Sequence, residues 1–207
     1  MADRLKGKIA VVFGAGSSGE GWGNGKAAAV AFAREGARVA CIDISQAAAE
    51  ETAAIINGEG GVAIALAADV TRQASIDSAV AATMTRFGRI NILHNNVGVT
   101  HMGGPVELSE EQFQAAIDLN LGPVYRCSKA VIPHMLAGGG GAIVNISSIA
   151  AIRWVGYPYF AYYATKAAVN QATVALAMQY ARQGIRANCI MPGLIDTPMI
   201  YKQISAQ

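Results

Sequence analysis

A tyrosine and a lysine stand four residues apart at Tyr162 and Lys166, in an alanine-rich stretch with the pattern of a helix. Positions i and i+4 share one face of a helix, so the phenol and the ammonium can lie side by side. A free phenol titrates near pH 10, and a neighbouring cation favours its ionised form. The pair therefore suits proton transfer. The alternative is a tyrosine that packs on a snorkelling lysine, a role for which Tyr163 is the natural candidate.

Two serines follow a β-branched run, in the segment NISS at 145–148. Ligands of parallel sheets gather where the strands end, so Ser148 could hold a substrate oxygen beside Tyr162. Taken alone, a pair of serines at a strand end more often forms a turn or a cap. The interpretation of Ser148 thus depends on its neighbours in space.

A glycine-rich stretch, FGAGSSGEGWGNGKAAA at 13–29, matches the phosphate-binding fingerprint of dinucleotide-binding folds, which needs a helix to begin at its last glycine. The three glycines within 20–25 would each cost a helix about 1 kcal/mol. We therefore expect the helix to begin near Asn24 or Gly25. The loop before it would be long, with Gly14, Gly23 and Gly25 at points of close approach and the helix N-terminus facing a pyrophosphate. A flexible surface loop would explain the glycines equally well.

An aspartate, Asp43, ends the second apolar run about 20 residues beyond the glycines. There a carboxylate can accept hydrogen bonds from the ribose hydroxyls of an adenosine. Ser45 and Gln46 follow, and no arginine stands nearby to receive a 2′-phosphate. The sequence favours NAD over NADP, although a strand-end aspartate can also be a solvated turn residue.

Short β-branched runs alternate with longer helical patterns along the chain. The expected strands are 8–13, 38–43, 61–67, 91–95, 141–147 and 185–191, and the expected helices are 26–35, 47–56, 72–87, 109–136 and 162–182. The strands lack a polar alternation, which indicates burial on both faces. We predict the α/β class, with a doubly wound, Rossmann-type parallel sheet and helices on both faces.

Composition argues against several other classes of protein. The 207 residues, of which 53% are hydrophobic, suit a single domain over residues 1–207. A net charge of +2 without a basic block argues against nucleic acid as a partner. The apolar run at the N-terminus is too short for a signal or a membrane span, so we expect a cytoplasmic chain. Cys41, Cys127 and Cys189 lie far apart in apolar segments, which indicates buried thiols and no metal site.

Several motifs agree in order, and with them the chain resembles the classical short-chain dehydrogenase/reductase family over essentially its whole length. The glycine stretch looks like the family's glycine motif, NNVG at 95–98 like its NNAG strand end, and Asp69 with Val70 like its adenine-binding pair. The stretch 192–199 resembles its nicotinamide-side segment. Four residues match its catalytic tetrad, namely Asn120, Ser148, Tyr162 and Lys166.

The resemblance implies an oxidoreductase that moves a hydride between NAD and a secondary alcohol or ketone. Tyr162 would transfer the hydroxyl proton as acid or base, Lys166 would bind the nicotinamide ribose and lower the pKa of the tyrosine, and Ser148 would hold the substrate oxygen. Asn120 would anchor a water that relays the proton, with Pro123 kinking its helix. The expected cofactor-binding residues are Gly14, Ser17, Gly23, Asn24, Gly25, Asp43, Ile44, Asp69, Val70, Asn96, Gly98, Tyr162, Lys166, Pro192, Gly193, Ile195 and Thr197.

The resemblance also implies a homodimer or homotetramer, in which the helices expected at 109–136 and 162–182 pair across a dimer axis. The aromatic stretch 152–160 suggests an apolar or cyclic small-molecule substrate. Arg153, within that stretch, could meet a substrate carboxylate or could be solvated. We expect no metal, nucleic acid or membrane among the partners.

The chain departs from the family pattern in three regions. The glycine loop carries about five extra residues, and Phe13 replaces a threonine. Ser148 and Tyr162 are one residue further apart than is commonest, which leaves Ser147 as a weaker alternative. The family's substrate-covering segment and seventh strand would follow Gln207, so we expect that part to be absent. This keeps a second hypothesis open, a catalytically weak NAD-binding sensor or assembly protein of the same fold.

Overall fold

Each β-branched run of the sequence forms a parallel strand. The computed structural model describes residues 3–204, and within them six strands form one sheet in the order β3-β2-β1-β4-β5-β6. All neighbouring pairs are parallel, which confirms the predicted sheet. The strands are β1 (Ile9–Phe13), β2 (Arg38–Asp43), β3 (Val62–Ala67), β4 (Ile92–Asn95), β5 (Gly141–Ile146) and β6 (Ile185–Ile190).

Side chains of the central strand β1 point alternately into two apolar layers. Ile9, Val11 and Phe13 belong to one core cluster, whereas Ala10 and Val12 belong to a second cluster on the opposite face. All of them are at most 3% exposed. A strand that is buried on both faces has no polar side, which explains why the runs in the sequence are continuously apolar.

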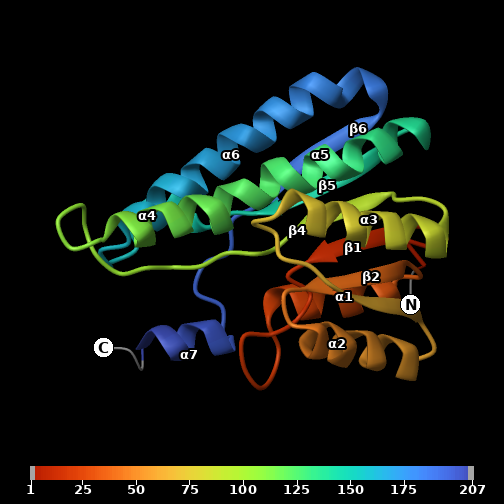
Figure 1. The fold of residues 1–207 in the computed structure, drawn as a ribbon, viewed down its shortest axis with the longest axis horizontal. Helices are drawn as coiled ribbons and strands as arrows, with labels where there is room; N and C mark the ends of the chain where they lie inside the picture. Colours follow the sequence, from red (N-terminus) through yellow and green to blue (C-terminus); the bar gives the residue numbers. More distant parts are fainter. Residues whose placement is uncertain (1–2, 205–207) are drawn as a thin grey trace.

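Helices cover both faces of the sheet (Figure 1). The side chains of α1 (Asn24–Arg34) and α2 (Gln46–Gly58) complete one core cluster. The other cluster includes side chains of α3 (Gln73–Phe87) and α5 (Gly122–Ala137), with α6 (Phe160–Tyr180) packed against it. The predicted doubly wound arrangement is therefore confirmed.

The single helix predicted at 109–136 is divided into three parts. A capping box at Ser109 starts α4 (Glu110–Ala116). A π-helical turn over Ile117–Leu121 follows, closed by an amide that donates to a carbonyl five residues back. Pro123 then lies in the first turn of α5, where its missing N–H is tolerated. The expected kink at Pro123 is wrong in detail, because the irregularity is a π turn that precedes the proline.

The carboxyl ends of the six strands meet at one edge of the described sheet, and the strand order reverses between β1 and β4. Ligands of open α/β sheets bind at such a reversal. Two short elements stand near this edge, the 3₁₀ turn Ile149–Ala151 after β5 and α7 (Pro198–Ile204) after β6. A further 3₁₀ turn, Ala181–Gln183, ends α6. Figure 1 shows α7 beside the long loop that precedes α1.

Candidate active site

A cavity of about 920 Å³ opens at the carboxyl edge of the sheet, a volume within the range of small-molecule sites. Residues at or just after the end of each described strand line it. Gly25 and Asn120 do not belong to the lining. The residues selected from the sequence that do line it are Gly14, Ser17, Gly23, Asn24, Asp43, Ile44, Asp69, Val70, Asn96, Gly98, Ser148, Tyr162, Lys166, Pro192, Gly193, Ile195 and Thr197.

Two glycines allow α1 to pack directly against the end of β1. Gly14 has a φ of +77°, and a Cβ there would lie 3.0 Å from Val97. A Cβ on Gly25 would lie 1.8 Å from the carbonyl oxygen of Gly14, so no side chain fits between helix and strand. The side-chain amide of Asn96 donates to the same oxygen at 3.0 Å. The helix begins at Asn24, as the glycine spacing predicts.

Gly16 is a further close-approach position, which the glycine spacing alone did not reveal. A Cβ on Gly16 would lie 2.6 Å from Cβ of Ala48 and 2.9 Å from Oδ2 of Asp43. The Gly16 N–H donates to this oxygen at 2.9 Å, and the Ser45 N–H donates to Oδ1 at 3.1 Å. Asp43 therefore fixes the glycine loop besides lining the cavity. In the sequence, the motif Gly14-Ala15-Gly16 was the one feature that pointed to this position. The side chain that a Cβ on Gly16 would meet, Ala48, belongs to α2 and could not be read from the motif.

The phosphate end of the cavity fits a dinucleotide. The Ser17 hydroxyl oxygen is buried and has no hydrogen-bond partner among the residues that the structure describes, although Ser17 lines the cavity. The first turn of α1 follows, without an acidic residue or a side-chain cap. Helix N-termini favour anions through their N–H groups and dipole. A phosphate group would satisfy both the hydroxyl and the helix end.

The end of the cavity beside β2 and β3 carries two carboxylates, Asp43 and Asp69. Oδ1 of Asp69 accepts hydrogen bonds from the N–H of Thr71 at 2.9 Å and from its hydroxyl at 2.6 Å. The side-chain hydrogen bond from Thr71 is the main reason why the pKa of Asp69 lies below its usual value. Acceptors for hydroxyl or amino groups thus stand on this wall, next to the apolar side chain of Val70.

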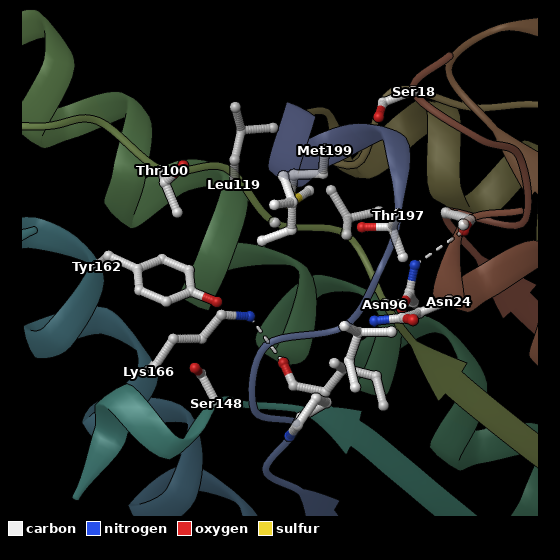
Figure 2. Close-up of a pocket in the computed structure, with 18 of the residues that line it drawn as sticks. Ser18, Asn24, Asn96, Thr100, Leu119, Ser148, Tyr162, Lys166, Thr197 and Met199 are labelled. Carbon is white, nitrogen blue, oxygen red and sulfur yellow. Dashed lines mark hydrogen bonds between the residues drawn. The ribbon is translucent and has the colours of Figure 1, made fainter. Parts of the chain in front are cut away.

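Three polar side chains, Ser148, Tyr162 and Lys166, converge at the end of the cavity beside β5 and α6 (Figure 2). Tyr162 and Lys166 lie one turn apart on α6, and Ser148 follows β5. The Lys166 ammonium lies 5.6 Å from the centroid of the Tyr162 ring and donates to the carbonyl oxygen of Ile146 at 2.7 Å. Lys166 is 3% exposed, and burial lowers its pKa from 10.5 to about 8.

The phenol of Tyr162 titrates above its ordinary range in this chain. Burial raises its pKa, and a hydrogen bond with Ser148 offsets part of that effect. The pKa of Tyr162 is therefore not lowered overall in the chain by itself, and a lowering by Lys166 together with an oxidised nicotinamide stays a prediction. The spacing in the sequence pairs Tyr162 with Lys166, but it does not show that Tyr162 is half-buried or that the ammonium donates to Ile146.

The two serines after β5 have different contacts. Oγ of Ser147 donates to the carbonyl oxygen of Lys166 at 3.0 Å, which ties β5 to α6. Oγ of Ser148 accepts from the N–H of Ala150 at 3.2 Å, and Ser148 is close enough to Tyr162 to lower the pKa of the phenol. These contacts favour Ser148 over the weaker alternative Ser147 as the group beside the phenol.

Tyr163 has a packing role, but its ring packs on Trp154 and not on the lysine expected from the sequence. Its hydroxyl accepts from the N–H of Val155 at 2.9 Å and donates to the carbonyl oxygen of Tyr157 at 3.0 Å. Its ring stacks on Trp154 with centroids 5.2 Å apart. Tyr163 therefore holds the loop that carries part of the cavity wall, and it is not itself in the lining.

Asn120 lies in the π turn, behind the cavity wall, and is 2% exposed. Its Oδ1 accepts from the N–H of Val99 at 2.7 Å, and its Nδ2 donates to the Val99 carbonyl and to the Thr165 hydroxyl, each at 3.0 Å. Both amide hydrogens are used in this way. Asn120 thus joins the loop after β4 to α6 next to Lys166, and its expected water relay stays a prediction.

Comparison with known proteins agrees with this geometry. The family profile described as short chain dehydrogenase matches residues 8–207. The chain belongs to the short chain dehydrogenases. It is accordingly an oxidoreductase that acts on alcohols and uses a nicotinamide cofactor.

Relatives of this short chain dehydrogenase carry the names of different alcohol dehydrogenases. It is 40% identical to 2-(R)-hydroxypropyl-CoM dehydrogenase of Xanthobacter autotrophicus over 93% of its own length and 76% of the relative. It is 38% identical to D-threitol dehydrogenase of Mycolicibacterium smegmatis over 96% of its length and 74% of the relative. A crystal structure from Burkholderia xenovorans, described as a short-chain dehydrogenase/reductase, matches with a TM-score of 0.94 and 43% identity, covering 98% of this chain and 80% of that one.

Two features are absent from residues 3–204 of this dehydrogenase. None of the helices described there combines the length and the hydropathy of a membrane span. The same residues contain no group of three or more histidine, cysteine, aspartate or glutamate side chains arranged to hold a metal ion.

An aromatic wall borders the substrate end of the dehydrogenase cavity. Trp154, Tyr157 and Tyr159 line it, and the last two rings lie 5.6 Å apart. Arg153 lines the same wall and is exposed. Three lining residues that were not among the predicted site residues, Thr100, Leu119 and Met199, come from the loop after β4, the π turn and α7 (Figure 2).

We expect the buried charge of Lys166 to reduce the stability of the dehydrogenase at neutral pH. Below pH 8 the lysine is charged in both the folded and the unfolded state, so the full free-energy cost of burying the charge reduces the stability of the folded state. As the pH rises from about 8 toward 10.5, the native lysine loses its proton first and the penalty fades. The free energy of unfolding of the wild type relative to Lys166→Met should therefore rise by about 2 kcal/mol between pH 7 and pH 10.

Urea unfolding across this pH range measures the difference. Lys129→Met removes an exposed lysine on α5 and keeps Lys166, so its curve should run parallel to that of the wild type. If the free energies of unfolding of the wild type and of Lys166→Met changed in parallel with pH, the lowered pKa of Lys166 would be contradicted.

Proposed function

We propose that this chain is an NAD-dependent dehydrogenase that interconverts a secondary alcohol and its ketone, with Tyr162 as the acid and base. The observation that carries the proposal is the convergence of Tyr162, Lys166 and Ser148 on a cavity whose other end fits a dinucleotide. The family and the dehydrogenase names of the relatives support it.

The cofactor would lie along the carboxyl edge of the sheet. Asp43, Ile44, Asp69 and Val70 would bind the adenosine, and the glycine loop with Ser17 and the start of α1 the pyrophosphate. When bound, the nicotinamide supplies the site at which a hydride is accepted or donated. The nicotinamide half would be held by the remaining lining residues predicted from the sequence, which are Asn96, Gly98, Tyr162, Lys166, Pro192, Gly193, Ile195 and Thr197.

Proton transfer at the substrate oxygen would fall to the phenol of Tyr162. Ser148, which lines the cavity together with that phenol, would donate to the same substrate oxygen and hold it in line. The Lys166 ammonium, fixed by Ile146, would place a positive charge where phenolate develops, which favours transfer from the alcohol. Because burial raises the pKa of Tyr162, formation of the phenolate depends on the positive charge of Lys166.

The substrate class follows from the wall around Tyr162. Trp154, Tyr157 and Tyr159 offer apolar and aromatic surface, which suits an apolar or cyclic alcohol. A relative from Sphingobium indicum, 37% identical over 96% of this chain and 77% of its own length, is named 2,5-dichloro-2,5-cyclohexadiene-1,4-diol dehydrogenase. That name supports a cyclic alcohol as the first compound to test.

Tyr162→Phe should lower kcat by at least about 10²-fold, because it removes the proton-transferring hydroxyl. Binding of NAD should stay near the wild-type value, since the ring remains. Absorbance of the reduced nicotinamide during turnover of a panel of secondary alcohols, with calorimetry for NAD, measures both. Tyr163→Phe is the matched control and should keep most of the activity. An inactive Tyr163→Phe beside an active Tyr162→Phe would refute the assignment, and a wild type that binds NAD without any turnover would favour a sensor.

Asp43 should determine the choice between the two nicotinamide dinucleotides. Its carboxylate would accept hydrogen bonds from free ribose hydroxyls and repel a 2′-phosphate. Asp43→Asn keeps the shape of a side chain that also supports Gly16, yet removes the charge. Calorimetric titration should show a wild-type preference for NAD over NADP that narrows in this variant. Equal affinities in the wild type would remove Asp43 from the role.

The outer faces of α5 and α6 would form the contact of a homodimer or homotetramer. Tyr125, Val174 and Met178 are 65%, 51% and 78% exposed on these helices, which is unusual for large apolar side chains that stay in water. Met178→Glu should therefore shift sedimentation toward a smaller species, whereas Val106→Glu, on an exposed loop, should not. A wild type that sediments as a monomer would contradict this contact.

A further inference from the structure

The extra residues of the glycine loop are anchored by a buried lysine. We call residues 18–22 the inserted segment, because they account for the extra length between Ser17 and Gly23. Lys26 lies in the first turn of α1 and is 3% exposed. Its ammonium donates to the carbonyl oxygen of Gly21 at 3.2 Å and lies 5.5 Å from the ring centroid of Trp22. Both contacts are with the inserted segment.

The charge of Lys26 is balanced from a second helix. Its ammonium pairs with Oε1 of Glu51 on α2 at 2.5 Å. A buried cation is tolerated only when it is paired and hydrogen-bonded, and here every one of these contacts lies outside the cavity. Lys26 is absent from the cavity lining. Any effect of Lys26 on a ligand in the cavity would therefore be transmitted through the inserted segment and not through direct contact.

The inserted segment lies near the opposite wall of the cavity (Figure 1). A Cβ built on Gly21 would lie 4.0 Å from Cγ of Pro198, which is ordinary contact distance. Pro198, Met199 and Ile200, at the start of α7, line the cavity. Figure 1 shows the loop before α1 beside this end of α7. The segment thus lies between the phosphate side of the cavity and the start of α7, close enough for a small closing movement to bring the two into contact.

We propose that Lys26 is a positioning residue that holds the inserted segment against α7, and that it thereby retains the pyrophosphate and nicotinamide half of the dinucleotide. The inference rests on the proposed function, since it assumes that the cavity binds NAD or NADH. None of the contacts described for Lys26 is with Asp43 or Asp69, which would bind the adenosine. Loss of the anchor should therefore weaken binding of the whole dinucleotide and spare a ligand that fills the adenosine end alone.

The first measurement asks whether Lys26 anchors the segment. The chain has two tryptophans, so a Trp154→Phe background leaves Trp22 as the sole fluorescent reporter of its kind. Acrylamide should quench Trp22 more strongly when Lys26→Met is added to that background. Lys26→Arg, which keeps a donor and a cation, should restore part of the protection. Unchanged quenching in Lys26→Met would overturn the anchoring step.

The second measurement compares two ligands in the otherwise unaltered chain. Lys26→Met should raise the Kd of NADH about tenfold, the effect of losing one charge-assisted hydrogen bond that orders the segment. The Kd of AMP, measured by competition, should stay within about twofold, because AMP lacks the half that the segment covers. Glu51→Gln, which keeps an amide oxygen for Lys26, is the matched control and should weaken NADH less than Lys26→Met.

The outcomes separate this inference from the function on which it rests. A wild type that binds neither NAD nor NADH would remove the proposed function itself. A wild type that binds NADH, with Lys26→Met binding it equally well, would overturn only the role of Lys26. An equal loss for NADH and AMP would also overturn it, since that pattern indicates damage to the whole fold. If Lys26→Met does not fold, Trp22→Ala, at a side chain 47% exposed, tests the same contact and should show the same NADH-selective loss.

Discussion

The hydrogen bond from the Lys166 ammonium to the carbonyl oxygen of Ile146 fixes the reactive end of the molecule. It connects α6 to the end of β5, and Ser147 adds a second connection by donating to the carbonyl of Lys166. A cation buried to this degree is stable only when it donates to good acceptors, so the helix cannot slide along the strand without losing them. Tyr162, one turn earlier on α6, is placed by the same constraint.

The phosphate end of the site depends on glycines, at positions where no side chain would fit. Gly25 packs on the Gly14 carbonyl, and Gly16 packs on Ala48 and on Asp43, at distances that leave no room for a Cβ. These contacts bring the start of α1 to the end of β1, where the strand order reverses. A ligand that spans the cavity therefore meets backbone N–H groups at one end and an ionisable phenol at the other.

Local rules were enough to predict the strands, the layers and the start of α1 at Asn24, because periodicity and glycine cost are properties of neighbouring residues. They were not enough for Gly16, whose obstacle is Ala48 on another helix. The π turn at Asn120 also depends on distant groups, since its amide bonds to the loop after β4 and to α6. The raised pKa of Tyr162 in the chain by itself could not be predicted from spacing, because desolvation is set by packing, which spacing does not describe.

Two lysines are almost equally buried in this chain, and they differ in what balances their charge. Lys26 is paired with Glu51, so its charge is neutralised within the protein. None of the ion pairs formed within residues 3–204 includes Lys166, which donates to a carbonyl instead. A carbonyl satisfies a hydrogen without cancelling a charge, so Lys166 keeps a positive field beside the cavity. That field is available to a phenolate or a substrate oxyanion, whereas Lys26 can only support the backbone around it.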